Sequence, residues 1–297
     1  MSNVPYVLGP MRLPFLILAP ACVLVGLGTA VQVSKGVETL SFVLALVGAI
    51  AAHISVNAFN EYFDFKSGLD FRTRRTPFSG GSGVLPERPE FAGRALLTAW
   101  VTFVLTALVG LYFIWLWGWE ILPLGLLGLF VVLAYTSWLA YNPFLFLIAP
   151  GLGFGTFMVM GTHFALTGEY GWTAFVGSLV PFFLVSNLLL LNQFPDVDAD
   201  RTVGRRHLPI VIGRRASSLI YGAFLLLAYL SIGVGVWLGM FPRFGLLGLA
   251  TVPLAILAYR GARRHAEDPE KLTPALTMNV LINILTPALL GVGLMLG

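Results

Sequence analysis

The sequence predicts an all-α, polytopic membrane protein in which nine transmembrane helices form one bundle. Of its 297 residues, 57% are hydrophobic and only 11% are charged, and the mean hydropathy is +0.85, far from the composition of a soluble domain. The apolar runs are about twenty residues long, which is the length of a membrane-spanning helix and about twice that of a barrel strand. The predicted helices cover residues 12–33, 39–62, 92–117, 119–136, 145–167, 173–196, 214–239, 243–260 and 273–296.

The first predicted helix, 12–33, is too long for a signal peptide and is followed by further spans, so we expect it to stay in the protein. Cys22 is the single cysteine of the chain, which excludes a disulfide framework. Its position inside the helix favours a small buried apolar side chain.

The second predicted helix, 39–62, leads into a polar stripe. His53, Asn57, Asn60 and Asp64 stand at positions i, i+4, i+7 and i+11, which form one face of a helix. Polar side chains within a membrane face a cavity or the bundle interior, because each is costly in lipid. We therefore expect this face to line a site, although a lone histidine such as His53 is more often a hydrogen-bonded interior residue or a lining residue than a ligand.

A loop of residues 63–91 follows, and its segment 76–83 reads TPFSGGSG. This segment is too rich in Gly and Ser for a buried element. It is typical of a mobile lid or a backbone-amide cradle for an anion, or of a flexible linker. We predict that loop 63–91 is an active-site lid within a single domain, residues 1–297.

The sixth predicted helix, 173–196, presents Asn192, Asp196 and Asp200 at positions i, i+4 and i+8 if it stays helical. It runs in the same direction as the second helix, so both Asn-x-x-x-Asp motifs reach one membrane face. Residues 197–213 form a second active-site loop. The matching positions suggest two four-helix halves plus one appended helix, and parallel repeats place a site at their interface.

The remaining polar side chains within predicted helices are His163, Asn187 and the pair Asn279 and Asn283 on the ninth helix. We interpret them as interhelical hydrogen-bond partners rather than as site residues.

The basic residues divide unequally between the two sides of the predicted bundle. One side collects 16 of the 18 Lys and Arg residues, and only Lys35 and Arg243 lie on the other. By the positive-inside rule, the N-terminus and the basic loops are cytoplasmic and the C-terminus is outside. The formal charge of +4 thus reflects orientation, and we expect a multi-pass protein of the cell membrane with no nucleic-acid partner.

Carboxylates on two helix ends that meet at one face are unfavourable, because a helix C-terminus already carries partial negative charge. We expect a cation between them. Asp and Asn oxygens suit a hard divalent ion such as Mg²⁺, which commonly also binds substrate phosphate, and the basic loops supply donors for phosphate oxygens. The alternative is that these carboxylates form interface salt bridges with neighbouring arginines.

At these motifs the chain resembles the UbiA superfamily of intramembrane prenyltransferases. Segment 60–70, NEYFDFKSGLD, is similar to the first aspartate-rich motif of the MenA-like, naphthoate-prenylating branch, and segment 192–204, NQFPDVDADRTVG, is similar to the second. Arg12-Leu-Pro resembles the start of the family's first helix. Tyr135 and Tyr141 resemble its connection between helices 4 and 5.

The resemblance implies nine helices around a central cavity, in which Mg²⁺, as two ions, is held against an isoprenyl diphosphate. The implied metal ligands are Asn60, Asp64, Asn192, Asp196 and Asp200. The implied catalytic residues are Asp64, Asp196, Asp200, Lys66 and Arg201, and the implied substrate-binding residues are Arg12, Asp70, Arg72, Tyr135, Tyr141 and Arg205.

The implied reaction is the transfer of an isoprenyl group to a small aromatic acceptor at the cytoplasmic face, with release of diphosphate and no protein partner. Dihydroxynaphthoate or a related quinone precursor is the first choice of acceptor, as in menaquinone biosynthesis. Two departures bear on the acceptor: His207 stands where the family commonly has Thr, and Gly151–Phe154 lacks the acid of the MenA-like pattern.

Two other classes compete with this interpretation. The polar stripes could line the pathway of a membrane transporter, but the acids crowd one membrane face rather than the midplane. A CDP-alcohol phosphotransferase would also use intramembrane aspartates, but its Asp-Gly-x-x-Ala-Arg signature is missing from the sequence.

Overall fold

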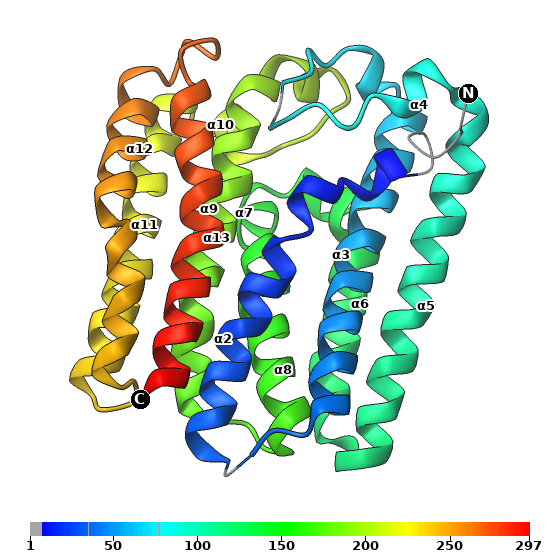
Figure 1. Ribbon diagram of the computed structural model, residues 1–297. Helices are drawn as coiled ribbons and strands as arrows, with labels where there is room; N and C mark the ends of the chain where they lie inside the picture. Colours follow the sequence, from blue (N-terminus) through cyan, green and yellow to red (C-terminus); the bar gives the residue numbers. More distant parts are fainter. Residues whose placement is uncertain (1–7, 35, 77) are drawn as a thin grey trace.

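The computed structural model describes residues 8–34, 36–76 and 78–297, and these residues form an all-helical bundle (Figure 1). Eight helices in this part of the chain are long and apolar enough to cross a membrane. The first predicted helix corresponds to α2, Leu18–Val33, preceded by two short 3-10 turns at Gly9–Met11 and Leu13–Phe15. The turns and α2 meet at a bend of 53°, and a ninth span results only if this bent pair is counted as one.

The other helices follow the predicted order. The long elements are α3 (Thr39–Ser67), α5 (Ala92–Trp117), α6 (Leu122–Ser137), α7 (Pro143–Gly151), α8 (Met158–Thr167), α9 (Trp172–Thr202), α11 (Arg214–Trp237), α12 (Val252–Arg264) and α13 (Thr273–Leu296). A π-helical turn, Leu152–Phe157, joins α7 to α8, and a 3-10 segment, Arg243–Thr251, precedes α12. The short helices α4 (Val84–Glu87) and α10 (Leu208–Val211) lie in the two long connections.

Helices α3 and α9 extend further than the sequence predicts. Helix α3 continues to Ser67 and ends at Gly68, whose φ of 77° gives the left-handed cap that glycine adopts most easily. Helix α9 continues to Thr202 despite Pro195 in its last turns, where Arg214 Nε donates to the Phe194 carbonyl at 2.8 Å. The motif aspartates therefore stand on ordered helical turns rather than at the start of loops.

Close helix contacts fix the centre of the bundle. A Cβ on Gly28 of α2 would lie 2.7 Å from the Gly291 carbonyl oxygen of α13, and a Cβ on Gly291 would lie 2.6 Å from the Leu24 carbonyl. Only small residues permit backbones to approach so closely. Helix α9 is the most buried of the eight spans, with 67% of its apolar window inside the protein.

Interhelical hydrogen bonds confirm the structural role predicted for several polar side chains. Asn187 Nδ2 donates to the Tyr221 carbonyl at 2.7 Å, and Tyr221 Oη donates to Asn279 Oδ1 at 3.1 Å. On the other side of the bundle, His163 Nδ1 lies 3.0 Å from Thr29 Oγ1. These bonds connect α9 with α11, α11 with α13, and α2 with α8.

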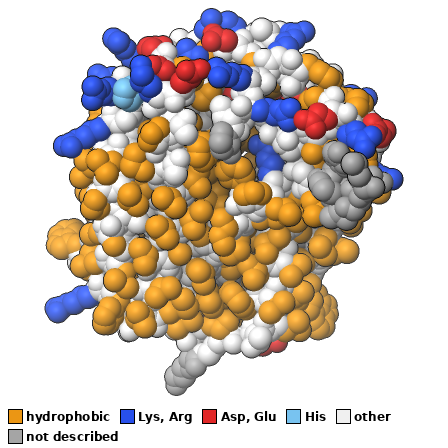
Figure 2. All heavy atoms as spheres, turned by 45° about the horizontal axis from the view of Figure 1, so that its top comes forward, with side chains coloured by type: hydrophobic (Ala, Val, Ile, Leu, Met, Phe, Trp, Pro, Cys, Tyr) orange, Lys and Arg blue, Asp and Glu red, His pale blue; other side chains and the backbone are white. Residues whose placement is uncertain are grey.

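Charged side chains gather at the end of the bundle where α3 and α9 terminate, above a wide apolar belt (Figure 2). Exposed side chains of the belt include Leu108, Leu226 and Trp237, at 56%, 60% and 82% exposure. Such a surface suits lipid rather than water. The charged end thus marks one membrane interface.

Candidate active site

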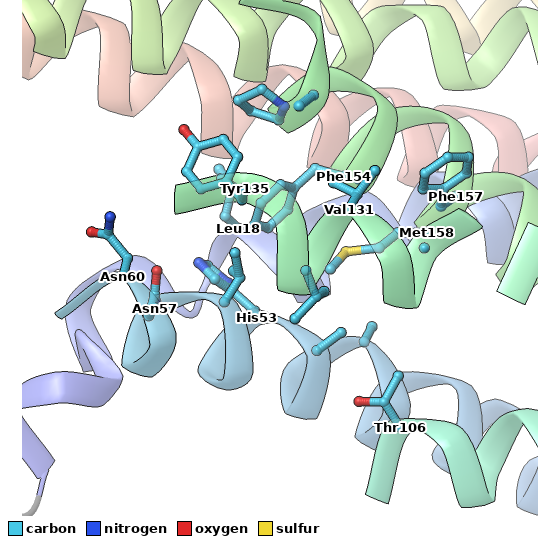
Figure 3. Close-up of a pocket in the computed structure, with 18 of the residues that line it drawn as sticks. Leu18, His53, Asn57, Asn60, Thr106, Val131, Tyr135, Phe154, Phe157 and Met158 are labelled. Carbon is cyan, nitrogen blue, oxygen red and sulfur yellow. The ribbon is translucent and has the colours of Figure 1, made fainter. Parts of the chain in front are cut away.

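A cavity of about 560 Å³ lies between α3, α5, α6, the α7–α8 segment and α9. Its polar end is lined by side chains from both motifs, and it continues between apolar helices as far as Thr106 and Ile121. In the close-up, His53, Asn57 and Asn60 project from α3 toward the cavity, facing Tyr135 and Phe154 (Figure 3). The polar stripe predicted on the second helix therefore lines the cavity.

The first motif contributes Asn60 and Asp64, one turn apart on α3. Asn60 Nδ2 donates to Asp64 Oδ2 at 3.0 Å and to Thr136 Oγ1 of α6 at 3.1 Å. Asp64 is 6% exposed, and its other oxygen, Oδ1, accepts from Arg205 Nη2. Both oxygens of this carboxylate are therefore occupied.

The second motif contributes Asn192, Asp196 and Asp200, each one turn after the last on α9. Asp200 is 3% exposed and accepts from Arg205 Nη1 at 3.0 Å, while its second oxygen lies 2.9 Å from His207 Nε2. Asn192 Oδ1 and Asp196 Oδ1 are buried and have no hydrogen-bond partner among the described residues.

Arg205 is the bridge between the two motifs. It comes just after the end of α9, where the chain turns at Gly204 with a φ of 80°. Its two Nη atoms contact Asp64 and Asp200, which lie 136 positions apart in the sequence. One largely buried guanidinium thereby bridges two helix-end carboxylates and offsets part of their charge.

Arg12 provides a second cation at the polar end of the cavity, through a contact that the sequence did not reveal. Its φ of 51° makes it the one non-glycine residue with positive φ among those described. Arg12 Nε donates to Glu61 Oε1 at 2.9 Å, and Nη2 donates to Asn60 Oδ1 at 3.1 Å. Glu61 is fully buried and also accepts from Ser82 N at 2.7 Å and Ser82 Oγ at 2.8 Å.

We call residues 68–76 and 78–83 the cover loop, because several of them line the cavity at its charged end. Gly81 has a φ of 71°, and a Cβ there would come within 3.2 Å of both Asp70 Oδ1 and Glu61 Oε1. Asp70 lines the cavity, and its Oδ2 has no partner among the described residues. Burial, and then the nearby Asp64 and Glu61 carboxylates, raise the pKa of Asp70 to about 8.

Aromatic and imidazole rings form the next layer of the cavity wall. Tyr135 stacks on Phe146 with centroids 5.0 Å apart, and its buried hydroxyl has no partner among the described residues. His53 meets Phe154 edge-on at 4.6 Å. His53 is thus a lining residue, as the sequence indicated.

Four residues expected at the site do not line the cavity. Lys66 and Arg201 are exposed, and the Lys66 ammonium lies 5.7 Å from the centre of the Tyr62 ring. Arg72 is exposed and donates to Thr202 Oγ1 at 3.1 Å, and Tyr141 is 46% exposed. All four belong to the charged end of the bundle but point away from its interior.

The oxygen donors of this site fit a hard divalent cation. Three buried oxygens without partners line the cavity and come from a carboxylate or an amide: Asp70 Oδ2, Asn192 Oδ1 and Asp196 Oδ1. Such oxygens are the ligands that Mg²⁺ prefers. Within the described ranges no group of three or more His, Cys, Asp or Glu side chains converges on one point, and Arg205 stands between Asp64 and Asp200.

Comparison with known proteins gives a consistent result. A sequence model of the UbiA prenyltransferase family matches residues 19–283. The chain is 27% identical over 264 residues to 1,4-dihydroxy-2-naphthoate octaprenyltransferase of Bacillus subtilis (strain 168), covering 88% of this chain and 83% of that protein. It is 22% identical over 261 residues to 2-carboxy-1,4-naphthoquinone phytyltransferase of Synechocystis sp., covering 85% and 80%.

Solved structures share the fold. A UbiA homolog from Aeropyrum pernix K1 superposes with a TM-score of 0.72 at 17% identity, covering 95% of this chain and 97% of that one. A UbiA homolog from Archaeoglobus fulgidus, bound to GPP and Mg²⁺, superposes with a TM-score of 0.63 at 15% identity, covering 96% and 99%.

Proposed function

Since the chain belongs to the UbiA prenyltransferase family, we propose that it transfers an isoprenyl group from a polyprenyl diphosphate to a small aromatic acceptor in a Mg²⁺-dependent reaction. Prenyl transfer itself is the activity that the family and the named relatives share. The observation that carries the proposal is the cavity, whose charged end joins both motifs and whose depth is apolar.

The two parts of the cavity match the two parts of a prenyl diphosphate. Guanidinium groups of Arg12 and Arg205 lie at the polar end, where they can donate to diphosphate oxygens. The apolar helices α5 and α6 line the remainder, where a hydrocarbon tail is stabilised by burial. A lipid-soluble donor would thus bind with its reactive carbon at the boundary between the two parts.

The proposed metal ligands are Asn60, Asp64, Asn192, Asp196 and Asp200, with Asp70 assisting from the cover loop. Bound there, Mg²⁺, as two ions, would stabilise the charge of the leaving diphosphate. Arg12 and Arg205 share that work by donating to oxygens on which negative charge develops.

Aromatic faces and the cover loop would control the cation that remains after the diphosphate leaves. Tyr135 lines the cavity and presents a ring that can stabilise an allylic cation. The cover loop, fixed through Ser82 to Glu61, would exclude water, which would otherwise convert the cation to prenyl alcohol. We propose that segments 63–91 and 197–213, whose first residues belong to α3 and α9, both take part in closing the site.

The exposed basic residues have a different place in the proposal. They are Lys66, Arg72 and Arg201, all at the charged end of the bundle. Lys66 and Arg201 lie within two positions of a motif aspartate in the sequence, and Arg72 donates to Thr202, two positions after Asp200. We propose that they attract the anionic donor and neutralise its charge as it enters. Tyr141 would contribute at the same rim.

We propose a naphthoate-type acceptor, by analogy with relatives named for 1,4-dihydroxy-2-naphthoate and 2-carboxy-1,4-naphthoquinone. The reaction would then belong to menaquinone or related quinone biosynthesis. The transporter alternative has no support among these relatives, and the UbiA match also disfavours a CDP-alcohol phosphotransferase.

For the membrane we propose nine spans, with α2 and the turns before it acting as the first, in two four-helix halves plus α13. The active site and the N-terminus would face the cytoplasm of a cell membrane, and the C-terminus would lie outside. Buried Cys22 is the single cysteine, so new cysteines at Arg206 and Glu169 would report labelling from opposite sides. Labelling of both from one side would contradict this topology.

The test of the proposed reaction is product formation in reconstituted membranes. Purified protein is incubated with isoprenyl diphosphates of several lengths and a panel of aromatic acceptors, and lipid-soluble products are identified by mass spectrometry. We expect a prenylated naphthoate or related quinone precursor in the presence of Mg²⁺ and none with chelator. A panel without any prenylated product would overturn the proposal.

A further inference from the structure

The oxygen atoms of the two motifs are in two different states. Both oxygens of Asp64 and both oxygens of Asp200 are engaged, by Arg205, Asn60 and His207. By contrast, Asp196 Oδ1 and Asn192 Oδ1 are buried without a partner. The site is therefore divided into an open part and a part held by a protein cation.

Arg205 holds its position strongly. Its side chain is 11% exposed, and the two carboxylates it contacts have side chains 9% and 5% exposed. Charge-assisted hydrogen bonds are strengthened where water is scarce. Removal of this guanidinium without replacement would leave two buried like charges at adjacent helix ends, which is strongly unfavourable.

We propose that Arg205 is an internal counter-ion that occupies the Asp64–Asp200 part of the site, competes with metal there, and moves to the diphosphate when the donor binds. This inference rests on the proposed function, because it assumes that metal and diphosphate bind at these motifs. The two carboxylates then exchange the Arg205 guanidinium for metal. In turn, Arg205 exchanges the two carboxylates for diphosphate oxygens.

The exchange has a consequence for binding order. Without diphosphate, metal at Asp64 and Asp200 must displace Arg205, which then lacks an equivalent anionic partner. With diphosphate, Arg205 gains that partner, so metal and donor bind with positive coupling. Metal alone binds weakly, and the site is assembled fully only with the diphosphate present.

His207 keeps the carboxylate in place during the exchange. It is fully buried, and its Nε2 contacts Asp200. Its ring stacks on the Phe146 ring with centroids 6.4 Å apart. Second partners of this kind orient metal-ligating carboxylates. When Arg205 moves away from one oxygen of Asp200, His207 thus still holds the other.

The test is Mn²⁺ binding to chelator-treated protein, followed by the electron paramagnetic resonance signal of the free ion. Arg205→Gln is compared with Arg206→Gln, which removes the same charge from an exposed neighbour. Without diphosphate, we expect Arg205→Gln to bind Mn²⁺ about tenfold or more tightly than wild type, because a like charge has left the site, and Arg206→Gln to stay within about twofold. In saturating Mn²⁺, Arg205→Gln should bind an unreactive geranyl thiolodiphosphate about tenfold more weakly.

Thermal unfolding gives a second readout. In EDTA, Arg205→Gln should melt below Arg206→Gln, and added Mn²⁺ should reduce this difference. If Arg205→Gln fails to fold, Arg205→Lys serves, because a single ammonium cannot reproduce the two-atom bridge. It should bind Mn²⁺ more tightly than wild type, and equal affinity would overturn the inference.

The outcomes separate this inference from the proposed function. If Asp196→Asn loses Mn²⁺ binding but Arg205→Gln gains none over wild type, the metal site stands and the counter-ion exchange is wrong. If Asp196→Asn binds Mn²⁺ as wild type does, with and without the diphosphate analogue, the metal site itself is wrong and the inference falls with it.

Discussion

Replacement of Glu61 by Gln should loosen the cover loop and change the products of the enzyme. Glu61 is fully buried on α3 and accepts three hydrogen bonds, from Arg12 Nε and from the amide and hydroxyl of Ser82. The carboxylate thus joins three segments: the N-terminal turns, α3 and the cover loop. Glutamine keeps the size of the side chain but loses its charge and one acceptor oxygen.

The cost can be worked out from these contacts. A hydrogen bond to a charged group contributes about 1.5–3 kcal/mol, and breaking a buried ion pair costs about 3–5 kcal/mol. The Arg12 side chain is 25% exposed and keeps its bond to Asn60, which reduces the loss. We expect the closed cover loop to lose about 2–3 kcal/mol, which raises the opened population about 30- to 150-fold.

The assay measures prenyl alcohol and prenylated acceptor together, with the melting temperature in detergent. Glu61→Gln should lower the melting temperature and raise the alcohol share several-fold, because water reaches the allylic cation. Glu87→Gln is the matched control: its pair with Arg75 is exposed on both sides, and such pairs contribute about 0–1 kcal/mol. If the two variants give the same product ratio and melting temperature, the proposed role of Glu61 is wrong.

Three further predictions concern the cavity. In EDTA, the stability of the protein should fall as pH rises from about 4 to 8. The reason is that Asp70 ionises at its ordinary pKa of 3.8 when unfolded but keeps its proton up to about 8 when folded. Asp70→Asn should flatten this slope in melting temperatures measured across the range, and an unchanged slope would exclude Asp70 as its source. Tyr135→Phe should keep kcat/KM within about threefold and Tyr135→Leu should lower it about tenfold, because the ring face rather than the hydroxyl stabilises the cation; equal losses would contradict this. Gly125 lines the cavity, and a Cβ added there would meet open space; Gly233 also has open space but does not line the cavity. Gly125→Phe should therefore lower kcat/KM for long donors relative to short ones. The control Gly233→Phe should leave this ratio unchanged.

Sequence spacing was sufficient to predict the side chains that line the cavity from both motifs. Asn60 and Asp64 share a face of α3, and Asn192, Asp196 and Asp200 share a face of α9, because steps of four residues return to nearly the same direction. Parallel helices then bring the two faces to one end. These features depend on local periodicity and on span order, which a sequence contains.

The flanking basic residues depend on where each helix ends. Lys66 follows Asp64 by two positions, and Arg201 follows Asp200 by one, so in a continuing helix they turn away from the motif face. The sequence predicted that the helices stop at 62 and 196, which would have left these side chains free to turn inward. The extensions to Ser67 and Thr202 hold them outside the cavity.

Long-range partners were beyond sequence reasoning. Glu61 lies beside a motif residue but off its face, and its function comes from Arg12, 49 positions earlier, and Ser82, 21 positions later. His207 stood out as a departure from the family pattern, but its bond to Asp200 needed the turn at Gly204. Such contacts are set by packing rather than by spacing along the chain.

The most direct test of the split site is product formation by three single variants in reconstituted membranes, with and without Mg²⁺. Asp64→Asn and Asp196→Asn alter carboxylates that line the cavity, whereas Asp198→Asn alters a motif carboxylate whose side chain is 82% exposed. We predict Mg²⁺-dependent prenylated product from wild type and Asp198→Asn, and at least about a hundredfold less from the other two. Full activity of Asp64→Asn or Asp196→Asn, or wild-type activity that persists in EDTA, would contradict a metal-diphosphate site shared between α3 and α9.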